Sequence, residues 1–164
     1  MNRLMIRFTI LVFFICGTCQ LAAQSLLIDS LNRIVDGKEA YSSGDRIEAL
    51  GNLARLSVIE DKFEESHLLS EQAIKASWNE KDRKYGAFIY ATMAYAYIQQ
   101  DSLAKGVEAL DSAVWYASRT DDKKMKGYVK LRQGWLDYVL GDNELAYERM
   151  LEALRILHGQ NAFE

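Results

Sequence analysis

The sequence predicts an all-α fold in which three antiparallel helix pairs, preceded by one further helix, stack into a solenoid. Apolar residues recur at steps of three and four, as in Leu103, Val107, Leu110 and Val114, which places them on one face of a helix. No segment alternates between polar and apolar residues over the length of a typical strand. Three stretches also align at a spacing of 40 residues, a period typical of solenoids built from one repeated unit.

Small residues occupy three positions in each of these stretches. They are Ala54, Ala94 and Gly134 at the first position, Ser66, Gly106 and Ala146 at the second, and Ala73, Ala113 and Ala153 at the third. The first position falls on one predicted helix, and the other two lie two turns apart on one face of the next. We therefore expect small side chains to let the two helices of each pair approach closely.

The breaks in the periodicity define the predicted helices. We expect a helix over 25–42, followed by the pairs 46–60 with 62–78, 84–100 with 103–119, and 124–140 with 143–158. Asp61, Asp101 and Gly141 coincide in the 40-residue register, each just before a predicted helix. Asp61 and Glu64 have the spacing of a capping box, so Asp61 is expected to cap the helix that follows. Lys123 and its neighbours read as an ordinary helix start with charges of both signs.

The first 24 residues have the pattern of a secretory signal peptide. Arg3 and Arg7 precede an apolar run over residues 8–16, and Ala22 and Ala23 offer small side chains for cleavage before Gln24. The run is shorter than the roughly 20 apolar residues that span a bilayer, which makes a signal anchor the less favoured alternative. The sequence therefore predicts an exported protein, periplasmic or secreted, with a helical repeat domain over 25–164 and repeats at about 46–79, 84–120 and 124–159.

Cysteine usage and charge restrict the chemistry of the mature chain. Cys16 and Cys19 both lie in the predicted leader, so disulfides, thiol nucleophiles and cysteine metal sites are not expected after cleavage. Cleavage would also remove two Arg and no acid from the 20 Lys+Arg and 23 Asp+Glu of the chain. The resulting acidity disfavours nucleic acid as a partner of this region, and it disfavours a membrane surface after the leader is removed.

The spacing of the small residues also carries a family resemblance. The matching residues are Gly134, Gly141, Ala146 and Ala153 in the third stretch, Ala94, Tyr97, Gly106 and Ala113 in the second, and Ala54, Ser66 and Ala73 in the first. This pattern resembles the tetratricopeptide repeat, here of an exported bacterial type. The chain departs from that family in its longer period, in having no proline, and in placing Ser57 and Asp137 where Tyr97 matches the family's aromatic. HEAT-like repeats share a period near 40 residues and are the competing interpretation.

The resemblance implies a concave groove lined by the first helix of each pair. The positions that would face it are Glu48, Arg55 and Val58, then Phe88, Tyr95 and Ile98, then Tyr128, Trp135 and Tyr138. From these, the predicted partner-binding residues are Arg55, Phe88, Tyr95, Ile98, Tyr128, Trp135 and Tyr138. The alternative is that some of the rings pack between neighbouring helices. A clamp for a terminal carboxylate is not expected, because Gly51, Thr92 and Tyr128 stand where it needs Lys, Arg and Asn.

Residue patterns for catalysis or metal binding are missing from the sequence. His67 and Glu71 lie one helical turn apart, but no third ligand accompanies them, so no metal and no cofactor are expected. No phosphate-binding glycine loop or nucleophile motif occurs, and we expect no enzymatic activity.

The leading hypothesis is thus a non-enzymatic exported repeat protein that binds a protein or peptide segment in an aromatic groove. The alternative is the N-terminal sensory part of a longer membrane-bound signalling protein, a transcription regulator or a sensor kinase. The third helix pair is followed by no capping helix, so an exposed apolar face is expected there. Self-association through that pair is a further expectation.

Overall fold

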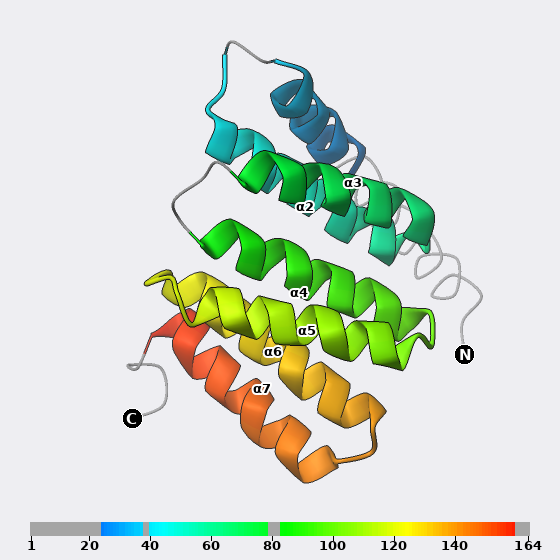
Figure 1. Cartoon of the computed structure of the whole chain (residues 1–164), viewed down its shortest axis with the longest axis vertical. Helices are drawn as coiled ribbons and strands as arrows, with labels where there is room; N and C mark the ends of the chain where they lie inside the picture. Colours follow the sequence, from blue (N-terminus) through cyan, green and yellow to red (C-terminus); the bar gives the residue numbers. More distant parts are fainter. Residues whose placement is uncertain (1–23, 38–39, 79–82, 160–164) are drawn as a thin grey trace, which may run out of the picture.

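The computed structural model describes residues 24–37, 40–78 and 83–159, and within these ranges all regular structure is helical (Figure 1). The predicted signal peptide falls on residues that are almost all outside the described part of the chain. After a helix over residues 24–36 come α2 (Ser43–Ile59), α3 (Phe63–Ser77), α4 (Lys84–Gln99), α5 (Leu103–Ala117), α6 (Lys123–Val139) and α7 (Asn143–His158). The predicted all-α class is confirmed for these residues. None of the described helices combines the length and apolar character needed to cross a membrane.

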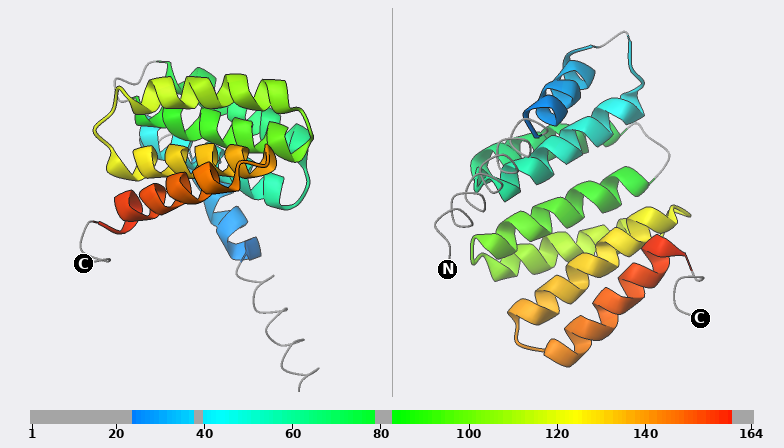
Figure 2. Two further views of the ribbon diagram at one scale, coloured as in Figure 1. Left: turned by 90° about the horizontal axis from the view of Figure 1, so that it is seen from below. Right: turned by 180° about the vertical axis from the view of Figure 1, so that it is seen from behind.

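The helices pack as three consecutive pairs, α2 with α3, α4 with α5 and α6 with α7, stacked along the long axis of the molecule (Figures 1 and 2). Contacts also join α2 to α4 and α4 to α6, whereas none are found between α3 and α5 or between α5 and α7. The first helices of the pairs therefore form one continuous layer, α2–α4–α6, which we call the first-helix layer. The helix over residues 24–36 lies at the α2 end of the stack (Figure 1).

The small residues in the 40-residue register face the neighbouring helix, as expected. All nine are buried, and the six with no exposed surface at all are Ala54, Ser66, Ala73, Ala94, Ala113 and Ala153. A Cβ added to Gly106 would lie 2.8 Å from Ile98 Cγ1, and one added to Gly134 would lie 2.8 Å from Met150 Cγ. Such distances are shorter than a van der Waals contact, so the close approach of α4 to α5 and of α6 to α7 depends on these glycines.

The predicted capping box at Asp61 is wrong, because this residue ends α2. Asp61, Asp101 and Gly141 all have positive φ, at 58°, 55° and 88°, and each follows the last turn of a first helix. In each turn the amide of the next residue donates a hydrogen bond to the carbonyl oxygen five residues before it in the helix. These bonds are Lys62 N to Ser57 O at 2.8 Å, Ser102 N to Tyr97 O at 2.9 Å, and Asp142 N to Asp137 O at 2.9 Å. This left-handed C-terminal cap favours Gly and tolerates Asp or Asn. The register thus marks three equivalent helix ends.

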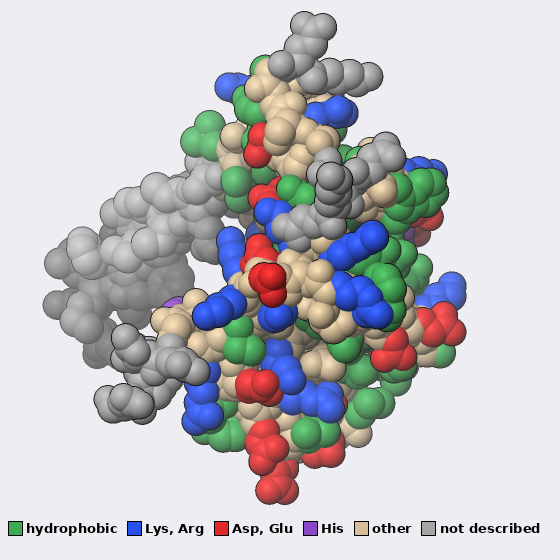
Figure 3. Space-filling model, turned by 60° about the vertical axis from the view of Figure 1, so that its left-hand side comes forward, with side chains coloured by type: hydrophobic (Ala, Val, Ile, Leu, Met, Phe, Trp, Pro, Cys, Tyr) green, Lys and Arg blue, Asp and Glu red, His purple; other side chains and the backbone are tan. Residues whose placement is uncertain are grey.

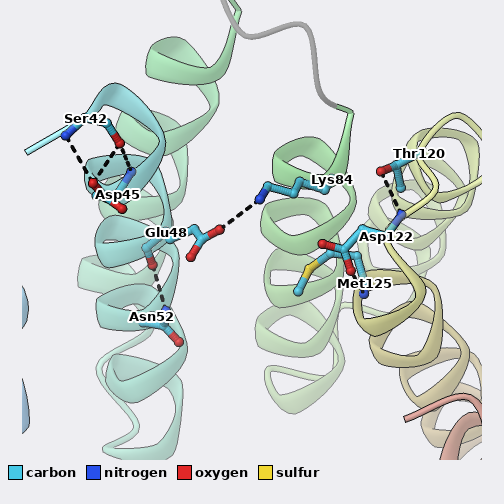
Figure 4. A network of polar contacts seen from close by, with 8 residues as sticks. All are labelled: Ser42, Asp45, Glu48, Asn52, Lys84, Thr120, Asp122 and Met125. Carbon is cyan, nitrogen blue, oxygen red and sulfur yellow. Dashed lines mark hydrogen bonds and ion pairs between the residues drawn. The ribbon is translucent and has the colours of Figure 1, made fainter. Parts of the chain in front are cut away.

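A capping box is present instead at the start of α2. Ser42 Oγ accepts a hydrogen bond from Asp45 N at 3.1 Å, and Asp45 Oδ2 accepts one from Ser42 N at 3.1 Å (Figure 4). The Ser42 hydroxyl and then its amide hold the pKa of Asp45 below its ordinary value. This cap begins α2 at Ser43, and the preceding helix ends at residue 36 rather than at the expected residue 42.

The last helix pair leaves large apolar side chains exposed. Tyr147 is 69% exposed, and Leu140 and Leu154 are also exposed.

Within the pair, Asp137 of α6 is buried, and Arg149 Nη1 of α7 lies 3.0 Å from both of its carboxylate oxygens. Asp137 thus takes part in an ion pair that joins the two helices.

Candidate binding groove

A hollow of about 460 Å³ lies on the first-helix layer, and we call it the groove. Its walls come from all three first helices and from the end of α7. The lining residues are Glu48, Asn52 and Arg55 of α2, Lys84, Tyr85 and Phe88 of α4, Lys124, Met125, Tyr128, Leu131 and Arg132 of α6, and Leu157 of α7. The groove therefore depends on the stacking of the three pairs, and no single pair could form it.

Phe88 forms the floor of the groove between α2 and α6. Its side chain is buried, and a Cβ added to Gly51 of α2 would lie only 2.5 Å from its ring. On the other side the ring centroids of Phe88 and Tyr128 are 5.5 Å apart, at an interplanar angle of 59°. The absence of a side chain at Gly51 thus lets Phe88 pack directly on the α2 backbone, and Phe88 holds the three helices at their spacing.

Arg132 is held in a fixed position by aromatic side chains. Its guanidinium carbon lies 4.0 Å from the centroid of the Tyr95 ring and 4.9 Å from that of Tyr128, both within the range of cation–π attraction. Arg132 Nη2 donates a hydrogen bond to the Tyr128 hydroxyl at 3.0 Å, and this hydroxyl is 3.4 Å from Thr92 Oγ1. These contacts order the Arg132 side chain, and it forms no ion pair with another described residue.

A second aromatic group continues from Arg132 toward the end of α6. Tyr95 and Trp135 have ring centroids 6.0 Å apart, and Trp135 and Tyr138 have centroids 5.6 Å apart. Trp135 Nε1 is buried without a hydrogen-bond partner among the described residues. Tyr138 is 54% exposed. The rings thus form a strip that extends the groove along the first-helix layer.

The seven predicted groove residues separate into three groups. Arg55, Phe88 and Tyr128 line the groove itself. Tyr95, Trp135 and Tyr138 form the adjoining strip, and Tyr95 contacts the groove residue Arg132. Ile98 is the exception and a correction: it is 4% exposed, and its Cγ1 occupies the space in front of Gly106 on α5. Ile98 is therefore a core residue of the second pair.

The cations of the groove were not recognised from the sequence. Besides Arg55, the lining contains Lys84, Lys124 and Arg132, whereas Glu48 is the one acid among the described residues that line it. Lys84, Lys124 and Arg132 each lie four residues from Phe88 or Tyr128, and residues with this spacing share a helix face. This four-residue spacing is the feature of the sequence from which the groove cations could have been predicted. The prediction considered only the groove positions that the family resemblance supplied.

The charged residues of the groove are only partly neutralised. Lys84 Nζ is 3.4 Å from Glu48 Oε1, which links α4 to α2 across the groove (Figure 4). Arg55 and Lys124 form no ion pair with another described residue. Figure 3 shows the side of the molecule on which α2, α4 and α6 begin, where basic side chains lie with acidic ones between them. The groove lining itself carries a net positive charge.

The described residues contain no group of three His, Cys, Asp or Glu side chains placed to hold a metal. His67 packs on Tyr97 with 4.5 Å between ring centroids, and its Nε2 is 3.5 Å from Gln100 Oε1, while Glu71 is exposed.

The groove offers guanidinium, ammonium and aromatic groups, which suit recognition of anions and apolar side chains.

Comparison of the chain with protein-family models, with curated proteins and with solved structures finds no match in any of the three.

Proposed function

We propose that the chain is a tetratricopeptide-like, non-enzymatic, exported repeat protein that binds a segment of a protein or peptide along its first-helix layer. The observation that carries this proposal is the groove, in which aromatic and basic side chains from three helices surround one hollow. Trp, Tyr and Arg are enriched among the few residues that carry most of the binding energy at protein interfaces, and the aromatic side chains bury large areas at a low cost in conformational entropy.

The preorganisation of Arg132 supports this proposal. Binding normally costs about 0.5–1.5 kcal/mol for each long side chain that becomes ordered. Arg132 is already held between Tyr95 and Tyr128, so part of that cost falls on folding instead of on binding. A rigid basic group beside a strip of rings is suited to an extended segment that presents both polar and apolar side chains.

The purified chain, selected against a displayed library of short random peptides, tests the proposal. We expect wild-type protein to enrich a family of peptides, and Arg132→Ala to weaken their binding by about tenfold or more. Arg119→Ala is the matched control, because Arg119 also stacks on a ring, 3.8 Å from the centroid of Trp115, but lies after α5 and outside the groove. Failure to enrich any peptide, or equal effects of the two substitutions, would contradict the proposal.

A further inference from the structure

We infer that the groove selects an acidic segment, one whose Asp or Glu side chains lie on both sides of an apolar residue. This inference rests on the proposed function and specifies the chemistry of the partner. The groove is basic although the whole chain has a net charge of −3, so its charge is opposite in sign to that of the protein as a whole. Complementary charge sets partner choice and orientation at interfaces.

Three of the four groove cations are free to meet carboxylates. Arg55 and Lys124 form no ion pair with another described residue, and Arg132 donates only to a neutral hydroxyl. Arg132 Nε is buried without a hydrogen-bond partner among the described residues, so the donors that a carboxylate can reach are those of the terminal nitrogens. A guanidinium with unused donors binds a carboxylate through two parallel hydrogen bonds, which makes it selective for that group.

The position of these cations indicates the pattern of the segment. Arg55 lies on α2 and Lys124 and Arg132 lie on α6, so these cations come from the two helices that flank α4 and its residue Phe88. Packed helices are about 8–10 Å apart, which puts the axes of α2 and α6 roughly 16–20 Å apart. The long basic side chains shorten that gap, and an extended chain rises about 3.3 Å per residue. Two carboxylates about two to four residues apart would reach both sides, with the apolar residue between them over Phe88.

This recognition differs from that of a free chain terminus. The positions at which the tetratricopeptide resemblance would place a terminal-carboxylate clamp hold Gly51, Thr92 and Tyr128. Gly51 offers no side chain, and the Thr92 hydroxyl donates to its own helix at Phe88 O, 3.0 Å away. The groove cations lie at other positions, where side-chain carboxylates within a segment can reach them.

The amino-acid composition of the selected peptides tests this inference separately from the proposed function. Selection with wild-type protein should raise the fraction of Asp and Glu about twofold or more over the input library, and amidation of the peptide terminus should leave binding unchanged. Selected peptides without an acidic excess, or binding that requires a free terminus, would overturn the inference while leaving the proposed function in place. Failure to select any peptide would overturn both.

Charge reversal at the exposed Lys124 provides a variant that should fold normally. Lys124→Glu should raise the dissociation constant of a selected peptide about tenfold, and wild-type affinity should fall as salt rises from about 50 to 500 mM. The matched control is Lys123→Glu, its exposed neighbour outside the groove lining, which should change the constant by less than about twofold. Equal effects of the two substitutions would overturn the inference.

An oligothymidylate serves as the nucleic acid probe. If it bound more tightly than the peptide, and if Lys124→Glu weakened its binding, the groove would be assigned to nucleic acid and the inference would be overturned.

Discussion

Replacement of Gly134 by leucine should destabilise the protein, because this glycine sets the distance between α6 and α7. A Cβ at this position would lie 2.8 Å from Met150 Cγ, 3.0 Å from the Ala146 carbonyl oxygen and 3.2 Å from Met150 N. Two of these three atoms belong to the α7 backbone, which cannot rotate away as a flexible side chain could. The helices must therefore separate by several tenths of an ångström, and the rest of the leucine side chain increases the separation.

The expected magnitude follows from two opposing terms. Overpacking a filled interior costs about 1–3 kcal/mol. Replacing glycine within a helix returns about 1 kcal/mol through backbone entropy, a gain that alanine and leucine share. We expect Gly134→Leu to lower the free energy of unfolding by about 1–3 kcal/mol, and Gly134→Ala to lie at or below the lower end of that range.

Thermal unfolding followed by circular dichroism measures this effect. A loss of about 1–3 kcal/mol corresponds to a decrease in Tm of roughly 3–10 °C for a chain of this size. Ala104→Leu is the control, because Ala104 is exposed on α5 and the same side chain should change stability there by less than about 0.5 kcal/mol. If Gly134→Ala raised the stability by the full helix-propensity gain, the added methyl group would meet nothing, and the proposed packing of α6 on α7 would be refuted.

Three further substitutions test other parts of the structure. Arg149→Met leaves the buried Asp137 carboxylate without its cation and should cost about 1–3 kcal/mol in denaturant unfolding, and no loss would mean that the pair does not form. Phe88→Ala removes the groove floor and should cost about 3–5 kcal/mol in the same assay, whereas a loss below about 1 kcal/mol would contradict its burial. Burial, and secondarily the neighbouring Tyr116, raises the pKa of the Tyr90 phenol, so folding favours its neutral form. The contribution of Tyr90 to the free energy of unfolding should be fully present below its unfolded-state pKa of about 10. It should be lost as pH rises through its pKa in the folded state. Tyr90→Phe should remove that part of the alkaline dependence of Tm, and an unchanged profile would contradict the raised pKa.

The helix pairing could be predicted from the sequence because close packing of two helices requires small side chains at the positions where they touch. Ala73, Ala113 and Ala153 recur at one spacing, and each lies where a larger side chain would hold two helices apart. The requirement acts on single positions, so it can be read without knowledge of the tertiary structure.

The turns were located by the same register, but their role was misinterpreted. Asp is favoured at helix N-caps and is also tolerated in the left-handed conformation that ends a helix, so Asp61 alone fits either role. Gly141 occupies the equivalent position, and glycine is enriched after the end of a helix rather than before its start. Its φ of 88° agrees with that preference.

The convergence of the basic side chains on one hollow could not be derived from any one helix, although their spacing from Phe88 and Tyr128 indicated a shared helix face. Lys124 read as part of an ordinary charged helix start, and Arg132 acquires its place from the Tyr95 ring on a neighbouring helix. Only the convergence of α2, α4 and α6 brings these charges to one hollow. Ile98 is an error in the other direction, because the resemblance assigned this residue to the groove although its side chain is buried against Gly106.

The three tryptophans provide the most direct test of binding along the first-helix layer. Trp135 belongs to the aromatic strip beside the groove, whereas Trp78 follows α3 and Trp115 lies on α5, and both of these are exposed and do not line the groove. Titration of ¹⁵N-labelled protein with a selected acidic peptide should shift the indole resonance of Trp135 and leave those of Trp78 and Trp115 in place. Saturable shifts of Trp78 or Trp115 with an unmoved Trp135 would contradict the account.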